Sequence, residues 1–356
     1  DRVKIENINI KGSISLQGAI IDDIIFKNYK VSLDSDEKVT FLNPKNSSEG
    51  YYIETGWASN SNENLKLPLD NTIWKVKGNK TLTPNNPIVL EWDNNEGLIF
   101  TKKIELDDKF LFKISQSVKN TSNKSYEFFP YAQITRNYKP DVIPIYILHE
   151  GFIGMFDDEL KETDYKDVED EKFTANSSKG WLGITDKYWL TVIVPEKGRK
   201  FKSEFLSSDG KYKANFIIKE PIELKANASI TNEINAFVAA KEVAVIDGYA
   251  DKMGIEKFDL AIDWGWFYFI TKPLFFVIEY FFKLTGNFGV AIIILTALVR
   301  IVFFPLSNYS FRSMAKMKIL QPEMVRLKEL HKDDKTKLQQ EMMALYKREK
   351  VNPVSG

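Results

Sequence analysis

One uninterrupted apolar segment constrains this chain more than any other feature of its sequence. The seventeen residues from Phe288 to Phe304 contain a single charged residue, Arg300. That length is close to the lower limit for a helix that crosses a bilayer. On the insertion scale the Ile, Leu, Val and Phe residues of the segment contribute about −4 to −7 kcal/mol, against about +3 kcal/mol for a central Arg. We therefore predict a transmembrane helix over residues 286–306.

The charges that follow this segment predict its orientation. Residues 309–350 contain eleven Lys or Arg and six Asp or Glu. An excess of basic residues next to a membrane span is typical of the cytoplasmic side. We therefore expect residues 307–350 in the cytoplasm and residues 1–262 on the opposite side of the membrane.

Residues 1–240 show the period-two alternation that is typical of half-buried strands. The pattern is clearest in the runs 88–92, 98–114, 189–194, 212–218 and 222–234, which are separated by turn residues such as Ser208-Asp209-Gly210. So many strands need a sandwich or a barrel to cover their edges. We predict an all-β sandwich over residues 1–240, followed by a partly helical linker over 241–262.

A dense aromatic segment precedes the predicted span. Within residues 263–284, the charged residues Lys272, Glu279 and Lys283 are spaced by seven and four, which places them on one helical face. Aromatic rings suit the headgroup region, and Lys side chains can reach outward from it. We predict an amphipathic helix lying on the membrane over residues 263–284.

Arg300 is the candidate functional residue of the predicted span. Gly289, Thr296, Arg300 and Ser307 are spaced by seven, four and seven residues, so small, hydroxyl and charged side chains share one helical stripe. A charge inside the membrane faces protein, a partner charge or a water-filled cavity. The alternative is that Arg300 extends to the cytoplasmic headgroups and anchors the helix end. The stripe alone leaves both interpretations open.

Residues 307–350 predict a helical hairpin. Apolar residues recur at intervals of three and four on both sides of a polar turn, His331-Lys332-Asp333-Asp334. The methionines of this pattern are Met314, Met317, Met324 and Met342. Methionine is flexible and adapts to many apolar partners, although at this spacing it is more often ordinary core packing. We take these four residues as candidate contacts for a partner or substrate.

The composition argues against several other functions. Lys plus Arg and Asp plus Glu balance at 49 each, so no overall charge attracts nucleic acid. The absence of Cys excludes disulfides and thiolate sites, and no nucleophile-elbow motif occurs. Nine acidic residues lie within 157–172, but their spacing does not match a calcium loop, and we expect a solvated loop there. We predict no metal site, no cofactor and no catalytic residue.

The membrane-proximal motifs resemble the YidC branch of the YidC/Oxa/Alb insertases. The matching motifs, in chain order, are Phe258-Asp259-Leu260-Ala261-Ile262-Asp263-Trp264-Gly265-Trp266, Lys272-Pro273-Leu274, Gly286-Asn287-Phe288-Gly289, Leu298-Val299-Arg300, Phe304-Pro305-Leu306, Ser313-Met314-Ala315-Lys316-Met317, Leu320-Gln321-Pro322, Gln340–Lys347 and Lys350-Val351-Asn352-Pro353. Residues 1–257 resemble the large periplasmic domain of the Gram-negative branch, and Gly180-Trp181 to Pro195 is the best local match.

The resemblance implies a multidomain, multi-pass protein of the bacterial inner membrane that is not an enzyme. Its periplasmic domain would be a β-supersandwich similar to sugar epimerases, followed by a helical membrane region and a cytoplasmic hairpin. A hydrophilic groove that contains Arg300 and Thr296 would receive the substrate. By this resemblance the chain is a fragment without the first transmembrane helix and the later ones, and residues 351–356 begin the next membrane segment.

The implied partners are nascent membrane proteins, the lipid bilayer, the Sec translocon with its accessory subunits SecD and SecF, and the ribosome or the signal recognition particle receptor. Insertion would proceed with or without the translocon. The alternative from another functional class is a membrane-tethered periplasmic domain that binds or modifies carbohydrate. A simple anchor would require neither Arg300 nor the hairpin.

Overall fold

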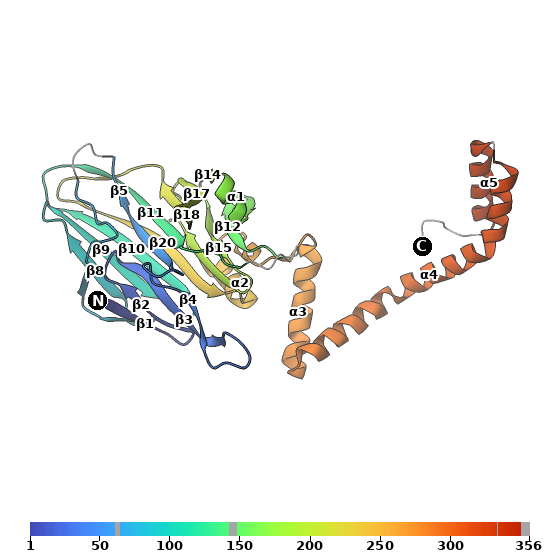
Figure 1. Cartoon of the computed structure of the whole chain (residues 1–356), viewed down its shortest axis with the longest axis horizontal. Coiled ribbons are helices and arrows are strands. Elements are labelled where there is room, and N and C mark those ends of the chain that lie inside the picture. Colours follow the sequence, from blue (N-terminus) through green and yellow to red (C-terminus); the bar gives the residue numbers. More distant parts are fainter. Residues whose placement is uncertain (61–64, 142–147, 333, 350–356) are drawn as a thin grey trace. The chain divides into compact units, whose positions relative to one another are not determined.

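The structure, a computed structural model, describes residues 1–60, 65–141, 148–332 and 334–349 (Figure 1). The chain divides into two compact units, Asp1–Asp263 and Trp264–Gly356. We call them the β unit and the helical unit. The predicted segment 351–356 and the motif at Lys350–Pro353 lie outside the described residues.

The first sheet of the β unit, sheet 1, is antiparallel except where β7 pairs with β1. Its spatial order is β14 (Phe173–Ser177), β17 (Phe201–Ser208), β18 (Lys211–Ile218), β11 (Tyr126–Arg136), β5 (Tyr51–Ala58), β3 (Ile20–Lys30), β2 (Ile10–Ser15), β1 (Arg2–Glu6) and β7 (Thr81–Leu82), with β19 (Ile222–Leu224) paired to β11 and β4 (Lys38–Leu42) paired to β3.

The second sheet, sheet 2, is antiparallel throughout the described strands. Its spatial order is β13 (Glu159–Thr163), β12 (Gly151–Phe156), β15 (Gly180–Thr185), β16 (Trp189–Val194), β20 (Ser229–Ala240), β10 (Leu111–Asn120), β9 (Leu98–Leu106), β8 (Ile88–Asp93) and β6 (Lys75–Lys77). The strands predicted from the alternation in 88–114, 189–194, 212–218 and 222–234 are confirmed.

The two sheets pack face to face around one apolar core. Strand β9 shows the underlying pattern, since its residues are alternately buried and half-buried along its whole length. Aromatic rings from the two sheets meet in the core: Phe26 of sheet 1 stacks on Trp189 of sheet 2 at 4.9 Å between ring centroids, and Phe152 of sheet 2 lies 5.2 Å from Phe205 of sheet 1. The predicted β-sandwich is therefore confirmed.

The segment 241–262 is partly helical as predicted, but it is not a linker, because it packs as part of the β unit. It forms helix α2 (Val243–Met253) and the short 3-10 helix η1 (Phe258–Ala261), and both contribute buried residues to the core. The ring of Phe258 packs edge-on against Trp181 of β15, 5.4 Å away. The hydroxyl of Tyr249 donates to the Asp107 carboxylate and accepts from the backbone N–H of Phe110 at 3.1 Å.

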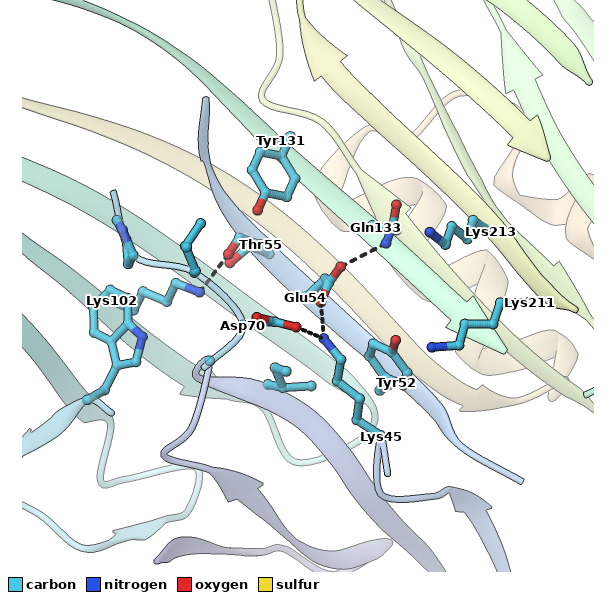
Figure 2. Close-up of a pocket in the computed structure, with 15 residues that line it drawn as sticks. Lys45, Tyr52, Glu54, Thr55, Asp70, Lys102, Tyr131, Gln133, Lys211 and Lys213 are labelled. Carbon is cyan, nitrogen blue, oxygen red and sulfur yellow. Dashed lines mark hydrogen bonds and ion pairs between the residues drawn. The ribbon is translucent and has the colours of Figure 1, made fainter. Parts of the chain in front are cut away.

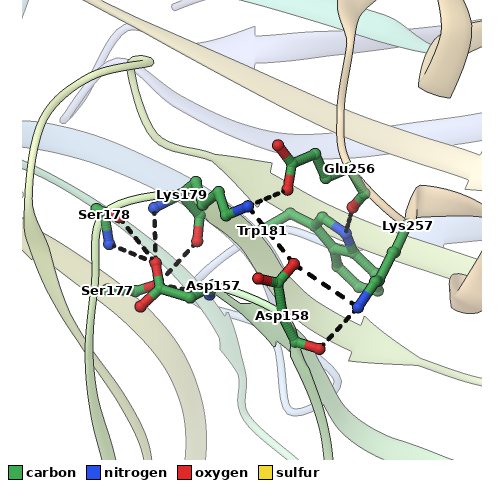
Figure 3. A network of polar contacts seen from close by, with 8 residues as sticks. All are labelled: Asp157, Asp158, Ser177, Ser178, Lys179, Trp181, Glu256 and Lys257. Carbon is green, nitrogen blue, oxygen red and sulfur yellow. Dashed lines mark hydrogen bonds and ion pairs between the residues drawn. The ribbon is translucent and has the colours of Figure 1, made fainter.

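Polar contacts hold the same segment to the hairpin between β12 and β13 (Figure 3). The Lys179 ammonium lies 2.6 Å from the Glu256 carboxylate and 3.5 Å from that of Asp158. Lys257 donates to the carbonyl of Asp158 at 2.9 Å, and the Trp181 indole donates to the carbonyl of Glu256 at 3.3 Å. The segment between α2 and η1 is therefore fixed to the sandwich at Glu256 and Lys257.

The acidic segment 157–172 is not a solvated loop as predicted. It contains strand β13 and a short helix, α1 (Tyr165–Asp170). Two apolar residues explain the difference, since Tyr165 and Val168 are both buried in the core while the carboxylates around them face outward. Because most residues of this segment are charged, its amphipathic pattern was not evident in the sequence.

The helical unit contains α3 (Tyr268–Thr285), α4 (Phe288–Leu330) and α5 (Lys335–Arg348). Helix α3 begins five residues later than predicted, because Gly265 has a positive φ of 71° that interrupts any helix before it. It ends at Gly286, also at positive φ, and the Asn287 side chain caps α4 by accepting from the Val290 N–H at 3.2 Å.

Helix α4 does not end at residue 306 as predicted. It continues through Pro305 and Pro322 to Leu330, so the predicted span and the first arm of the predicted hairpin are one helix. A proline removes only one backbone donor, and here no glycine or polar turn follows Pro305 to stop the helix. Within the described residues, α4 is the one helix that is long and apolar enough to cross a membrane.

Substitution of Phe258 tests whether 241–262 belongs to the β unit. Replacing this buried ring with Ala leaves a cavity, so Phe258→Ala should lower the free energy of unfolding of the β unit by about 3–5 kcal/mol. Urea unfolding of the purified chain in detergent, followed by near-ultraviolet circular dichroism, measures this. Val31→Ala, at a position 60% exposed, should change it by less than about 0.5 kcal/mol. Equal stability of the two variants would mean that the segment is a linker after all.

Candidate functional site

The polar stripe predicted on the membrane helix is present on α4. Gly289, Thr296, Arg300 and Ser307 all lie within the continuous helix, and the side chains of the last three are exposed in the chain as described. The Thr296 hydroxyl donates to the carbonyl of Ile292 at 2.8 Å, one turn back. Its hydrogen is thereby satisfied inside the helix, while its oxygen still has acceptor capacity.

Arg300 is exposed in the chain as described, and its donors are available. Among the residues that the structure describes, no carboxylate forms an ion pair with it, whereas Arg136 in the β unit lies 2.7 Å from Asp186. A guanidinium carries five N–H donors and keeps its charge at any physiological pH. The chemistry that Arg300 offers is therefore the binding of anionic or carbonyl oxygens.

The apolar side chains around this stripe are also exposed. Ile293, Ile301 and Val302 are 68–72% exposed, which a water-soluble helix would not tolerate over this length. The exposed aromatic residues of α3 include Phe269 and Tyr280, and Phe267 directly before the helix is exposed as well. The Lys272 ammonium lies 5.7 Å from the ring centroids of both Trp264 and Tyr268. A polar stripe in an apolar cylinder is the arrangement of a helix that faces lipid on most sides and water or protein on one.

The predicted helical hairpin is formed by the end of α4 and by α5. The turn at 331–334 is closed by the Asp334 side chain, which accepts from the Lys337 N–H at 2.9 Å. Arg348 near the end of α5 lies 2.9 Å from Glu323 on α4, so the two helices run antiparallel. Leu320 and Leu345 form the small apolar core between them.

The four candidate methionines divide into two groups. Met317 and Met324 pack against the Leu320–Leu345 core, and the Tyr346 hydroxyl lies 3.9 Å from the Met324 sulfur. Met314 is 44% exposed and Met342 is half-buried, and neither is part of that core. Two of the four residues therefore stabilise the hairpin itself, and two remain available to a partner.

A pocket in the β unit was not expected from the sequence (Figure 2). It has a volume of about 420 Å³ and lies on sheet 1, where β5 separates from β3. These two strands share a single residue pair, Ile21 with Ile53, in the described chain. Thr55, two residues further along β5, lies beyond that pair, and the segment around Leu69 and Asp70 covers the opening.

Lys102 reaches this pocket from the opposite sheet. Its side chain points inward from β9 and is only 3% exposed. The ammonium donates to the Thr55 carbonyl at 2.6 Å and lies 5.1 Å from the ring centroid of Trp74. Burial lowers the pKa of Lys102 to about 8, because an ammonium in a poorly hydrated site loses solvation. Strand β3 no longer pairs with β5 at Thr55, and the Lys102 ammonium supplies a hydrogen-bond donor to the Thr55 carbonyl in its place.

The two carboxylates of the pocket are already engaged. Glu54 lies 3.4 Å from the Lys45 ammonium and accepts from Gln133 at 2.7 Å, while Asp70 lies 3.3 Å from Lys45 (Figure 2). Figure 2 also shows the ammonium groups of Lys211 and Lys213 directed toward the pocket from β18. Neither forms an ion pair among the described residues, so the pocket is lined by more cations than anions.

One sequence signal pointed to this pocket. Along β9 the inward positions are Leu98, Phe100, Lys102, Ile104 and Leu106, so a lysine occupies a position where the alternation requires an apolar residue. A buried lysine needs a partner and often marks a site. Tyr131, Gln133, Lys211 and Lys213 gave no such signal, because they lie on the outward face of their strands.

Curated relatives match the whole chain. The Membrane protein insertase YidC of Pelagibacter ubique (strain HTCC1062) is 56% identical over 356 residues, which cover 100% of this chain and 63% of that protein. The protein of the same name from Bradyrhizobium diazoefficiens is 41% identical over 370 residues, which cover 100% of this chain and 60% of that protein. The chain therefore spans about three fifths of the length of these relatives.

Solved structures are similar at lower identity. An active YidC insertase crystal structure with its first transmembrane domain resolved is 14% identical, with a TM-score of 0.35, over 100% of this chain and 67% of that chain. A putative aldose 1-epimerase from Escherichia coli K12 is 10% identical, with a TM-score of 0.44, over 67% of this chain and 99% of that chain.

Two family models cover nearly the entire sequence. The model described as the YidC periplasmic domain matches residues 2–277, and the model described as 60Kd inner membrane protein matches residues 280–356. The first match extends through the sandwich, α2, η1 and into α3, and the second includes α4 with its polar stripe and α5. The chain belongs to the YidC family of membrane protein insertases.

Proposed function

We propose that this chain is part of an insertase that moves nascent membrane proteins into the bacterial inner membrane and assists their folding. In this proposal the β unit is periplasmic, α3 lies at the periplasmic surface, the apolar part of α4 crosses the membrane and the hairpin is cytoplasmic. The basic excess of residues 309–350 supports this orientation. Membership of the YidC family supports the activity.

The observation that carries the proposal is the polar stripe of α4. Arg300 and Thr296 lie on one face of a helix whose other faces are apolar and exposed. An arginine at this depth is stable when it faces a water-containing groove built with other helices. There it attracts acidic residues of a substrate's hydrophilic tail, while the substrate's apolar segment moves along the apolar helices into lipid. No covalent bond changes, and no cofactor is required.

The remaining partners belong to the same proposal. The hairpin receives the nascent protein from the ribosome or from the signal recognition particle receptor, and the periplasmic side contacts the Sec translocon and its SecD and SecF subunits when insertion depends on them. The alternative, a tethered carbohydrate-binding or sugar-modifying domain, explains a β-sandwich but assigns no role to a charge within the membrane helix.

Substitution of Arg300 tests the groove. We place this chain in the full-length Pelagibacter ubique insertase, in exchange for its matching segment, and measure insertion in cells depleted of their own insertase. An ion pair in a hydrated site contributes about 1 kcal/mol, a factor of roughly five in affinity. Arg300→Ala should therefore reduce insertion of substrates with acidic translocated tails by about fivefold and leave neutral tails nearly unaffected.

Two further variants make this test specific. Arg300→Lys keeps the charge and should retain much of the insertion, whereas Arg312→Ala, which removes an exposed arginine of α4 outside the apolar segment, should have no selective effect. Undiminished insertion of acidic tails by Arg300→Ala, or equal losses for acidic and neutral tails, would contradict an electrostatic role for the groove.

The division of the methionines gives a separate prediction. A photoreactive amino acid at Met314, which is exposed, should crosslink to a nascent membrane protein more strongly than one at Met317, which packs in the hairpin core. Lys328, an exposed position on α4 without apolar neighbours in that core, is the control and should give only background. Stronger crosslinking at Lys328 than at Met314 would exclude the methionines as the contact surface.

A further inference from the structure

The insertion mechanism proposed above does not use the pocket of the β unit. Its walls come from β5, β11 and β18 of sheet 1, from Lys102 of sheet 2 and from the segment around Asp70. All of these residues belong to the β unit, so the site is complete within one compact part of the chain. Its volume, about 420 Å³, is within the range of small-molecule sites, which are roughly 300–1,000 Å³.

The charges of the pocket select for an anion. Glu54 and Asp70 share Lys45 as their ion-pair partner, which neutralises part of their charge. Lys102, Lys211 and Lys213 have no carboxylate within ion-pair distance among the described residues. Lys102 is almost fully buried and uses one of its three donors, on the Thr55 carbonyl. The nearby Glu54 carboxylate already favours the charged form of Lys102, so Lys211 and Lys213 of β18 are the cations that an incoming anion meets.

The uncharged groups of the pocket favour a polar molecule of compact shape. Burial raises the pKa of Tyr131 to about 12, so its hydroxyl remains a hydrogen-bond donor at physiological pH. Gln133 and Thr55 add polar groups, and Tyr131 is the ring that a ligand can reach, because Tyr52 and Trp74 are only 3% and 2% exposed. No arginine and no helix N-terminus lines the pocket within the described residues, and these are the features that bind phosphate most effectively. A carboxylate suits separate lysines better.

We propose that this pocket binds a carboxylate-bearing, hydroxyl-rich small molecule about the size of a monosaccharide. The carboxylate lies beside Lys211 and Lys213 of β18, and the body of the ligand lies against Tyr131. An extended acidic peptide is the competing occupant. The volume of about 420 Å³ favours the small molecule, because it matches a compact ligand more closely than several residues of extended chain.

Calorimetry with matched ligands tests this proposal on the full chain in detergent. The probe is glucuronate, and glucose is the neutral control that lacks only the carboxylate. Glucuronate should bind saturably, and glucose should bind at least about tenfold more weakly, because a hydrogen bond to a charged group is worth roughly that factor or more. The peptide tri-glutamate should bind more weakly than glucuronate.

Two lysine variants locate the binding. Lys213→Ala removes a half-buried lysine of the pocket and should weaken glucuronate binding by about tenfold. Lys219→Ala removes the same charge from an exposed position just after β18, outside the pocket, and should leave binding unchanged. Absence of saturable glucuronate binding, equal binding of glucose, equal affinity in Lys213→Ala, or tighter binding of tri-glutamate would each overturn the proposal.

Discussion

A guanidinium ion cannot remain in hydrocarbon without water or a polar partner, and Arg300 imposes this condition on α4. The helix satisfies its own backbone hydrogen bonds, which is what allows it to enter lipid at all. Most of its side chains are apolar and compatible with lipid, whereas the side chains of one stripe are polar or charged. The stripe includes Thr296 and Ser307 as well as Arg300, so the demand for a polar neighbour extends along several turns. In the proposed groove other helices supply that neighbour, and α4 forms one wall of it.

The β unit satisfies its polar groups differently. Its two sheets bury one apolar core, and its strands pair almost throughout. Where β5 leaves β3, the Thr55 carbonyl would lack a partner, and Lys102 supplies one from the opposite sheet. The same separation of strands opens the pocket. A local break in strand pairing and a buried lysine are therefore two aspects of one feature, which links the fold of this unit to the proposed binding site.

The sequence predicted the elements whose periodicity is strong and local. The alternation in β9 and β10 and the apolar segment after Asn287 each have a direct counterpart in the structure. Predictions failed where tertiary contacts determine the local structure. In the segment 241–262 charged residues interrupt the apolar ones, and it is the packing of Phe258 against Trp181 and the hydrogen bond of Tyr249 to Phe110 that show that it belongs to the sandwich. The end of α4 was misplaced because Pro305 looks like a stop, although a helix can continue past it.

The candidate sites differ in the same way. Arg300 was predictable, because a charge within an apolar run is visible in the sequence. The pocket was not, because its lining residues are far apart in the chain and meet only through strand order. Among them Lys102 alone departs from its local pattern. The family matches extend over both units, and neither match identifies the residues of either site.

Cysteine labelling tests most directly whether one face of α4 lines a water-containing groove. The chain contains no cysteine, so single cysteines can be introduced into the full-length chimaera after those in its remaining part are replaced. Thr296 and Arg300 lie on the stripe, while Leu298 and Val302 lie at similar depths on the opposite face. A hydrophilic, membrane-impermeant maleimide should label positions 296 and 300 and leave 298 and 302 unlabelled. Equal labelling of both faces, or none at 296 and 300, would contradict the groove.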